Sequence, residues 1–280
     1  MSAGTLYVVA TPIGNLEDIS LRALRILKEA DLIAAEDTRH SRKLLTHYGI
    51  GTPLMSCHEH NETERAEQFV AMLKQGKSIA LISDAGTPAI SDPGFLLVRR
   101  CRREGLPVAS VPGVSAVVTA LSIAGMPCDR FEFGGFLPPK KMARMALFET
   151  LCYRELLSVF YESPHRLQAS LKDLEEVLGP EREVAVAREL TKIHEQILRG
   201  PVAEVREHFE REGARGEIVL LVGPGQAQAP ALSLEEALVS FERGGGLSPK
   251  EAVKQAAAQF GLSTAEVYRL RLRLKEEGRL

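Results

Sequence analysis

Residues 78–94 read Ser78-Ile79-Ala80-Leu81-Ile82-Ser83-Asp84-Ala85-Gly86-Thr87-Pro88-Ala89-Ile90-Ser91-Asp92-Pro93-Gly94. The apolar run at the start predicts a short buried strand. Ligands of parallel α/β folds bind beyond the carboxyl ends of the strands. The loop 83–94, with its small residues, two carboxylates and Gly/Pro breaks, is therefore the first candidate for a cofactor or substrate cradle. Gly, Pro and Asp are also ordinary turn residues, but this loop is longer than a strand-to-helix turn needs.

The same strand–loop–helix order continues on both sides of this segment. Strands are expected at 6–10, 32–35, 78–82 and 106–111, and helices at 20–30, 64–75, 95–104 and 115–124. This alternation predicts an α/β fold with a parallel, helix-covered sheet.

A second block follows with more strands than helices. Strands are expected at 131–136, 156–161, 183–187, 195–199 and 217–222, and helices at 142–152 and 165–178. The Gly/Pro/Gln/Ala-rich stretch 223–230 is typical of a linker.

The last part of the chain predicts three helices, over 234–243, 248–260 and 264–277, with a break at Gly244-Gly245-Gly246. Ser248 and Glu251 form a capping-box pattern, and the last two helices resemble a helix-turn-helix. The final helix carries Arg269, Arg271, Arg273 and Lys275. We favour a nucleic-acid-binding role for this part over a plain three-helix bundle with a solvated basic face.

Composition limits the class of protein. The chain has 280 residues, a length that is enough for two ordinary domains or for a large and a small one. Its formal net charge is −2. It has no apolar run near the length of a membrane span and no secretory signal pattern at its start. Its four cysteines fit no zinc or disulfide framework. We expect a reduced, cytoplasmic protein.

Several loops share a common position after a predicted strand: 11–16, 83–94, 112–116 and 161–164. None of them reads G-x-G-x-x-G or G-x-x-x-x-G-K-[ST], so the two commonest nucleotide-binding motifs are absent. What remains is a site of backbone groups, small hydroxyls and carboxylates, suited to a ligand with an amino acid part and a ribose.

Charged residues also gather at predicted strand ends. These are Glu36-Asp37-Thr38-Arg39, Glu162, Arg188-Glu189 and Lys192. The opposite charges in these groups can also be interpreted as surface ion pairs, which contribute little to stability. Lys140, Lys141 and Arg144 follow a Pro-Pro turn and are suited to neutralising phosphates.

The motifs together resemble the ribosomal RNA small subunit methyltransferase I family. They are LYVVATPIGN at 6–15, AEDTR at 35–39, SDAGTPAISDPG at 83–94, PGVSA at 112–116, FLPPKK at 136–141, YESPHR at 161–166 and ARELTK at 187–192. The resemblance implies a tetrapyrrole-methylase-like two-domain fold, a class III S-adenosylmethionine methyltransferase, with a small helical C-terminal domain. The implied domains are 1–118 and 119–226, with the cofactor between them, and 232–280.

The same resemblance implies an activity and partners. The expected reaction is S-adenosylmethionine-dependent 2′-O-methylation of a cytidine ribose in the decoding region of 16S ribosomal RNA. The expected partners are small-subunit ribosomal RNA or the 30S subunit, and a second copy of the chain in a homodimer. No membrane partner and no metal are expected.

Site residues follow from the matching motifs. The expected cofactor contacts are Pro12, Gly14, Ser83, Asp84, Ala85, Gly86, Thr87, Ile90, Ser115, Ala116, Tyr161, Ala187, Gly216, Glu217 and Ile218. The expected RNA contacts are Arg39, Lys140, Lys141 and Arg144.

Catalysis by such an enzyme depends mainly on alignment of the hydroxyl oxygen with an activated methyl group. A base that takes the hydroxyl proton helps further. The candidate bases are Asp37, Glu162 and Glu189, with Arg188 and Lys192 available to hold a carboxylate or a phosphate.

Two other functions remain open at this point. A methyltransferase of a small tetrapyrrole or of a protein side chain would use the same fold, but it would not need a basic helical tail. A non-catalytic RNA-binding protein would not need the small-residue cofactor loops.

Overall fold

The computed structural model describes residues 3–225, 233–244 and 247–280. The chain divides into two compact units, 1–225 and 226–280, which are treated separately below. The expected linker 223–230 and the glycine break 244–246 lie mostly outside the described residues. Among the described helices, none has both the length and the apolar character needed to cross a membrane.

The first sheet of unit 1 consists of short strands. They are β1 (Leu6–Val9), β2 (Leu32–Ala35), β3 (Leu54–Ser56), β4 (Ile79–Ile82) and β5 (Val108–Val111). Of these, β2 and β4 are buried along their whole length. The order is β3-β2-β4-β1-β5, and all its pairs are parallel. The predicted parallel sheet is confirmed. β3 was not expected.

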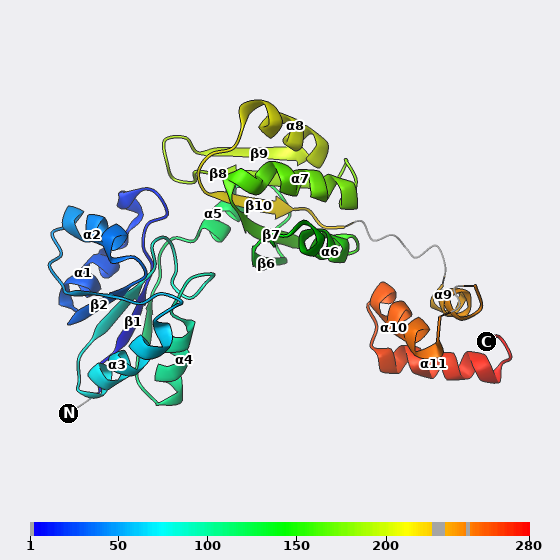
Figure 1. The fold of residues 1–280 in the computed structure, drawn as a ribbon, viewed down its shortest axis with the longest axis horizontal. Coiled ribbons are helices and arrows are strands. Elements are labelled where there is room, and N and C mark those ends of the chain that lie inside the picture. Colours follow the sequence, from blue (N-terminus) through cyan, green and yellow to red (C-terminus); the bar gives the residue numbers. More distant parts are fainter. Residues whose placement is uncertain (1–2, 226–232, 245–246) are drawn as a thin grey trace. The chain divides into compact units, whose positions relative to one another are not determined.

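Helices cover both faces of this sheet (Figure 1). They are α1 (Leu21–Glu29), α2 (Thr38–His47), α3 (Glu62–Lys74) and α4 (Phe95–Arg103), with a short 3-10 helix at Leu16–Asp18. Ile33 and Ile82 pack with α1 and α2 on one face. Leu32 and Leu81, which point the other way, pack with α3 and α4. The alternation follows from the two-residue period of a strand.

The second sheet of unit 1 is mixed. Its strands are β6 (Phe131–Phe136), β7 (Leu157–Glu162), β8 (Glu183–Arg188), β9 (Gln196–Pro201) and β10 (Ile218–Val222), in the order β6-β7-β10-β8-β9. β6 and β7 are parallel, and the other pairs are antiparallel.

Both faces of the second sheet are covered as well. On one face lie α6 (Lys141–Leu151), α7 (Pro164–Leu178) and α8 (Val202–Glu212), packed with Phe160 and Leu220. On the other lies α5 (Ala116–Ile123), packed with Val159 and Val219. The expected domain boundary after residue 118 falls inside α5. The helix α8 was not predicted.

Unit 2 is a small helical bundle with its own core. It comprises α9 (Leu234–Val239), a π-helical turn (Ser240–Gly244), α10 (Pro249–Phe260) and α11 (Thr264–Glu276). The predicted capping box of Ser248 and Glu251 is present. α10 ends at Gly261, whose φ of 64° is the left-handed C-cap that glycine adopts easily.

The loops that leave β1, β4 and β5 lie at the carboxyl edge of the first sheet, as the sequence predicts. Thr11 and Gly86 join the first two loops, since each backbone N–H donates to the other residue's carbonyl, at 2.9 and 3.0 Å. These loops therefore act as one rigid rim for whatever binds beyond the strands.

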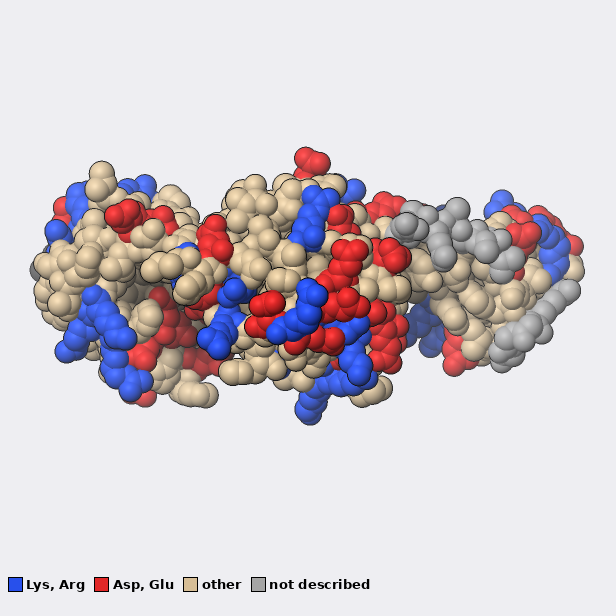
Figure 2. Space-filling model, turned by 90° about the horizontal axis from the view of Figure 1, so that it is seen from above, with Lys and Arg blue, Asp and Glu red and all other residues tan. Residues whose placement is uncertain are grey.

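Charge is distributed in small groups. The face drawn in Figure 2 carries Lys and Arg interspersed with Asp and Glu, rather than one continuous basic surface. On this face, a polyanion would therefore meet only local groups of basic side chains.

Candidate functional site

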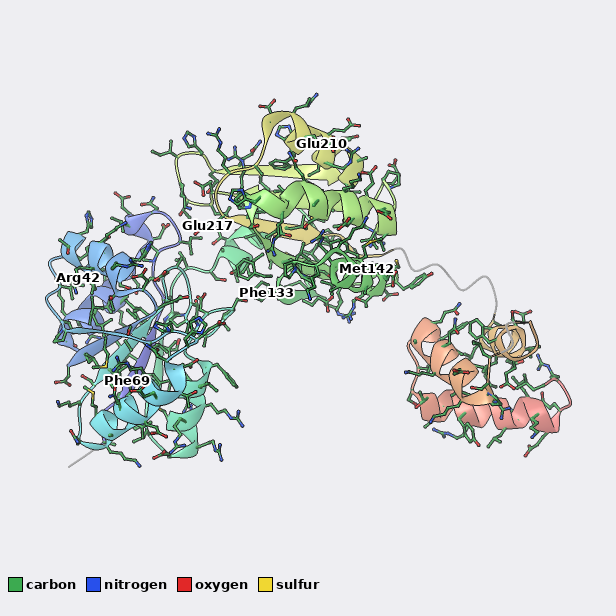
Figure 3. The ribbon with its side chains drawn as sticks, in the orientation of Figure 1. Arg42, Phe69, Phe133, Met142, Glu210 and Glu217 are labelled. Carbon is green, nitrogen blue, oxygen red and sulfur yellow. The ribbon has the colours of Figure 1, made fainter. Side chains whose placement is uncertain are left out.

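A cavity of about 430 Å³, the principal cavity, lies where the loops after β4 and β5 face the ends of β7 and β10. Its wall is mostly apolar or small, and its acidic members are Asp92, Glu162 and Glu217, the last of which precedes β10 (Figure 3). No Lys, Arg or His side chain is among the described residues that line it. The cavity is thus suited to a cationic or neutral ligand and unsuited to a phosphate.

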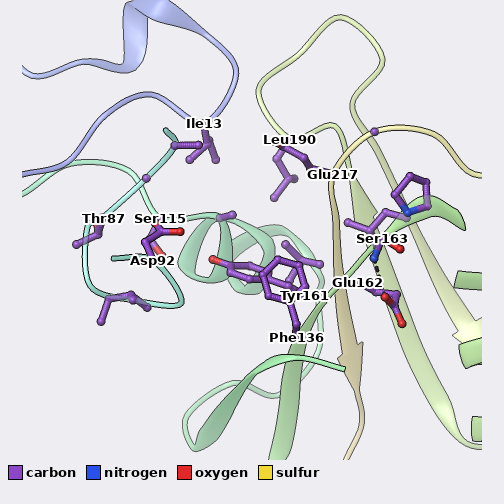
Figure 4. A pocket seen from close by; sticks show the side chains of 18 residues that line it. Ile13, Thr87, Asp92, Ser115, Phe136, Tyr161, Glu162, Ser163, Leu190 and Glu217 are labelled. Carbon is purple, nitrogen blue, oxygen red and sulfur yellow. Dashed lines mark hydrogen bonds between the residues drawn. The ribbon is translucent and has the colours of Figure 1, made fainter. Parts of the chain in front are cut away.

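The two sheets contribute opposite walls. Figure 4 shows Thr87, Asp92 and Ser115 on the side of the loops, and Tyr161 with Phe136 across from them. The Phe136 and Tyr161 rings contact edge-to-face, with centroids 5.3 Å apart. Such a pair gives the second wall a rigid aromatic surface.

The loops beside the cavity hold strained backbone. The non-glycine residues with positive φ in the described chain are Ala89 (68°), Ser91 (61°), Glu189 (50°) and Thr191 (65°). All of them lie in the loops 83–94 and 189–195. Such conformations persist where the surrounding structure enforces them, and they concentrate at functional sites.

Glu62, the first residue of α3, fixes the end of the loop 83–94. Its buried carboxylate accepts hydrogen bonds from the backbone N–H groups of Gly94 (3.0 Å), Leu96 (2.8 Å) and Leu97 (3.3 Å). These are orphan donors at the N-terminus of α4. The carboxylate therefore ties α3, α4 and the loop together.

Asp92 is the acid with the most perturbed environment in the principal cavity. Its pKa is raised to about 6: burial is the largest cause, the Ser83 hydroxyl acts against it, and the nearby Glu36 and Asp84 carboxylates add to the rise. Burial, and then the charges of Asp92 and Glu217, also raise the pKa of Tyr161. A carboxyl group with a pKa near neutrality suits proton transfer.

Glu162 lines the principal cavity, but its oxygens are engaged by protein donors. They accept from Ser163 N (2.7 Å), from Arg166 Nε and Nη2 (2.9 and 2.7 Å) and from Ser170 Oγ (2.5 Å). The side chain is fully buried. This carboxylate is therefore suited to fixing the end of β7 rather than to accepting a proton.

Lys192 and two acids form a charged group, the Lys192 cluster, beside the cavity. Lys192 Nζ donates to Glu189 Oε1 (2.8 Å) and to Glu217 Oε2 (3.0 Å). Burial lowers the pKa of Lys192, but the bonds to these acids outweigh it, so the net shift is upward. The hydrogen bond from Lys192 lowers the pKa of Glu189. The Lys192 ammonium and the Glu189 carboxylate therefore stay charged.

Two glycines make room for this cluster. A Cβ at Gly14 would lie 2.5 Å from Lys192 Cγ, and one at Gly216 would lie 2.0 Å from Glu189 Oε1. Both distances are too short for real contacts, so only glycine allows these side chains to lie across the backbone.

A second cavity of about 350 Å³ adjoins the first. Ile13, Ala85 and Glu217 line both cavities. The second cavity is also lined by Ser83, Asp84 and Lys192, by the loop after β1, and by His40, Ser41, Lys43 and Leu44 of α2. It has a mixed polar wall with both signs of charge.

The predicted cofactor contacts divide between these cavities. Lining the principal cavity are Ala85, Gly86, Thr87, Ile90, Ser115, Ala116, Tyr161, Gly216, Glu217 and Ile218. Lining the second cavity are Pro12, Gly14, Ser83 and Asp84, together with the shared Ala85 and Glu217. Ala187 lines neither cavity, because it is buried in the core of the second sheet.

The predicted catalytic residues are not brought together at one point. Asp37 caps α2 by accepting from Arg39 N (2.8 Å), and hydrogen bonds from Arg39 lower its pKa to about 2. Arg188 Nε donates to Gln196 Oε1 at 2.6 Å. Only Glu162 and Lys192 line the two cavities, and Glu189 reaches the site through Lys192.

One predicted RNA contact is wrong. Arg144 is buried, 4% exposed, and its guanidinium donates to Asp173 and to the carbonyls of Pro138 and Pro139. It holds the Pro-Pro turn and is not available to a phosphate. Lys141 pairs with Glu176 at 3.2 Å, and Lys140 is exposed.

In unit 2, Arg271 is paired with Glu242 (Nη2 to Oε2, 3.0 Å). Arg269 and Arg273, one turn apart on α11, are exposed. The basic surface of this helix is therefore smaller than the sequence suggests.

Sequence reasoning missed Asp92, Ile13, Phe136 and Leu190 as lining residues of the principal cavity. Asp92 has a signal, since it is the second carboxylate of the candidate loop. The other three are ordinary apolar residues whose role depends on how the two sheets face each other.

Residues 5–206 match the tetrapyrrole (corrin/porphyrin) methylase family. The chain is 53% identical over 229 residues to a "Ribosomal RNA small subunit methyltransferase I" of Pseudomonas aeruginosa, covering 81% of each chain. It is 48% identical over 267 residues to the protein of the same name from Pasteurella multocida, covering 95% of this chain and 92% of the relative.

Solved structures share the fold. The methyltransferase CobJ superposes with a TM-score of 0.60 and 20% identity, covering 79% of this chain and 95% of its own. A uroporphyrin-III-C-methyltransferase from Thermus thermophilus gives a TM-score of 0.56 and 23% identity, covering 79% and 94%. The expected tetrapyrrole-methylase-like fold is confirmed.

Proposed function

Because the chain belongs to the tetrapyrrole methylase family and, within it, to the ribosomal RNA small subunit methyltransferase I family, we propose that it methylates the 2′-oxygen of a cytidine ribose in the decoding region of 16S ribosomal RNA. The methyl donor of the family is S-adenosylmethionine. One observation carries the proposal: a cavity whose charged lining residues, among those described, are all acidic adjoins, through shared wall residues, a second cavity that is lined by charges of both signs.

The residues of the principal cavity fit the donor. Its volume of about 430 Å³ lies in the range of ligand pockets, about 300–1,000 Å³. The Glu217 carboxylate complements the ammonium group of the donor, and the apolar wall accepts a purine ring. Gly86, with φ at 76° and a Cβ site 3.5 Å from Ile13 Cγ2, lets the backbone come close to the ligand.

When bound, S-adenosylmethionine supplies a methyl group already activated for transfer. The chain's own task is to orient the acceptor hydroxyl and to remove its proton. Orientation contributes about 7–11 kcal/mol in well-aligned systems.

We propose that Asp92 accepts the proton of the acceptor hydroxyl. Its pKa of about 6 leaves it ionised at neutral pH and still basic enough to accept a proton. It lines the principal cavity on the loop 83–94, whose residue Ala85 lines both cavities. Of the three bases expected from the sequence, Asp37 and Glu189 have lowered pKa values and Glu162 is engaged by protein donors, so all three are weaker candidates.

Lys192 is proposed to orient the acceptor. Its ammonium lines the second cavity and is held by Glu189 and Glu217. A cation fixed in this way can hold a ribose oxygen or a phosphate oxygen at the junction.

A homodimer and three domains complete the proposal. Exposed apolar side chains outside the cavities favour contact with a second copy: Phe95 and Leu96 directly after the loop 83–94, Phe131 in β6 and Met142 in α6. We expect the enzyme in the cytoplasm, where ribosomal RNA is found. Because α5 packs on the second sheet, we propose moving the boundary between the first two domains to the start of α5.

The test is incubation of the purified protein with methyl-labelled S-adenosylmethionine and small ribosomal subunits that lack the modification. Label should enter the RNA of the subunits. A small tetrapyrrole acceptor, offered in parallel, should stay unlabelled. Label in the tetrapyrrole alone would contradict the proposal.

A further inference from the structure

The outer face of α2 forms a cationic groove that extends beyond the motif at 35–39 to Arg42, Lys43 and Thr46. Thr38, Arg39, Arg42, Lys43 and Thr46 line it, at spacings that bring them to one side of the helix. Arg42, labelled in Figure 3, and Lys43 are exposed, and no ion pair joins either to an acid within the part of the chain that the structure describes. Arg39 is paired with Asp37 at 3.0 Å. The free positive charge of the groove therefore comes from Arg42 and Lys43.

The groove is continuous with the site. Lys43 lines both the groove and the second cavity, and the second cavity shares Ile13, Ala85 and Glu217 with the principal cavity. A path therefore runs from the exposed face of α2, past Lys43, to the proposed donor pocket.

α2 is also fixed to the site by hydrogen bonding. The backbone N–H of its cap residue, Asp37, donates to Asp84 Oδ1 at 3.1 Å. Asp84 itself follows β4 and lines the second cavity. The groove and the loop 83–94 are thus held at a fixed distance from each other. A ligand strand that lies in the groove and places one end in the cavity requires such a fixed distance.

The charges of the groove indicate which class of ligand it binds. The principal cavity has acids and no cations, so phosphates are disfavoured there, whereas the groove offers cations and hydroxyls and no large apolar side chain. A peptide would need apolar pockets for its anchors. Lys, Arg and Thr side chains are typical contacts of a nucleic acid backbone.

We propose that the groove on α2 binds the phosphate backbone of the RNA next to the acceptor nucleotide, while that nucleotide occupies the second cavity. This inference rests on the proposed function and adds the course of the strand. Arg42 and Lys43 hold phosphates, and the strand reaches the junction of the cavities beside Lys192.

The test replaces both cations, Arg42→Ala with Lys43→Ala. The matched control is Arg99→Ala with Arg103→Ala, which removes the same charge from the exposed side of α4 on the opposite face of the sheet. Binding of single-stranded RNA and of small subunits is measured against salt concentration. The slope of log K against log salt should fall by about 1.4 for two lost phosphate contacts, at about 0.7 per contact.

Kinetics give a second readout. The KM for RNA should rise about tenfold in the α2 variant, with kcat at saturating RNA within about twofold of wild type, because phosphate contacts bind ground and transition state alike. The control variant should match wild type. The melting temperature and the affinity for S-adenosylmethionine, measured for each variant, show that the fold and donor site are intact.

Distinct results overturn the inference. An unchanged salt slope and KM would exclude phosphates from the groove. Loss of binding to whole subunits with naked-RNA binding unchanged would indicate a protein partner instead. If wild type binds RNA through α2 but transfers no methyl group, the groove is supported and the proposed reaction fails.

Discussion

At the scale of single residues, Asp92 combines a cost to stability with a chemical use. It is half-buried beside Glu36 and Asp84, and its pKa of about 6 is well above the 3.8 of a free aspartate. The environment that disfavours its charge also makes it a better base at neutral pH.

Replacing Asp92 by Asn should lower kcat by about 10²–10⁴-fold, the usual contribution of a positioned base. In the wild type, kcat/KM should fall as the pH drops below about 6, because protonated Asp92 accepts no proton. The rate of methyl transfer by the variant checks the first expectation, and the pH profile of the wild-type rate checks the second. Asp37→Asn is the control, and a larger loss there would move the base to Asp37.

The same substitution should stabilise the fold at high pH. The folded-state pKa of Asp92 lies above its unfolded value, so wild-type stability falls as the pH rises from about 4 to 6 and stays reduced above that range. Asp92→Asn should raise the free energy of unfolding at pH 8 by about 1 kcal/mol, since solvent screens this half-buried group, with little effect at pH 4. Denaturant unfolding at the two pH values measures the difference, and a destabilised variant at pH 8 would contradict it.

Gly14 and Lys192 form a coupled pair. A Cβ at position 14 would displace Lys192 from Glu189 and Glu217. Gly14→Ala and Lys192→Ala should therefore each lower kcat/KM. The double variant should lose much less transition-state stabilisation than the sum of the two single losses. A double-mutant cycle should give a coupling energy of about 1–2 kcal/mol. Additive effects would mean that Gly14 acts independently of the lysine.

At the scale of elements, the carboxylate of Glu62 joins two helices to the cofactor loop. Glu62→Ala leaves the first N–H groups of α4 without their acceptor. The free energy of unfolding should fall by about 2 kcal/mol and the affinity for S-adenosylmethionine should fall with it.

Glu62→Gln, which keeps one acceptor oxygen, should restore part of the loss. Glu64→Ala on the exposed side of the same helix should change stability by less than about 0.5 kcal/mol. Equal effects at positions 62 and 64 would contradict the capping role.

Strands that are continuously apolar, such as 79–82, could be predicted from the sequence, because burial on both faces leaves an unbroken run. α2 could not, because it buries only Ser41, Leu44 and Leu45, and its first turns are polar. β3 is too short to show a period. α8 does carry a signal in Val202, Val205 and Phe209 at helical spacing, which the sequence analysis overlooked.

The site shows the same limit. The loops that form it follow from strand order, since the carboxyl ends of parallel strands meet at one edge. The partners of each charge do not follow. Arg144 and Asp173 lie on different helices, α6 and α7, so their pairing depends on how these helices pack. Glu162 ends β7 and Arg166 lies in the first turn of α7, so their pairing depends on how that helix begins.

At the scale of the whole molecule, the two units have separate hydrophobic cores. The fragment 1–225 contains both sheets and all residues of the two cavities. It should bind S-adenosylmethionine with unchanged affinity and show the same rise in melting temperature. Its KM for RNA should rise, because Arg269 and Arg273 are lost. An unchanged KM would remove unit 2 from RNA binding.

The central claim is that the chain transfers a methyl group to one ribose oxygen of small-subunit RNA. The most direct measurement is mass spectrometry of nucleosides from methylated subunits, with the modified position located in RNA fragments. The account predicts 2′-O-methylcytidine at a single position in the decoding region. Methyl groups on a base, or RNA that stays unmodified while S-adenosylmethionine is bound, would contradict it.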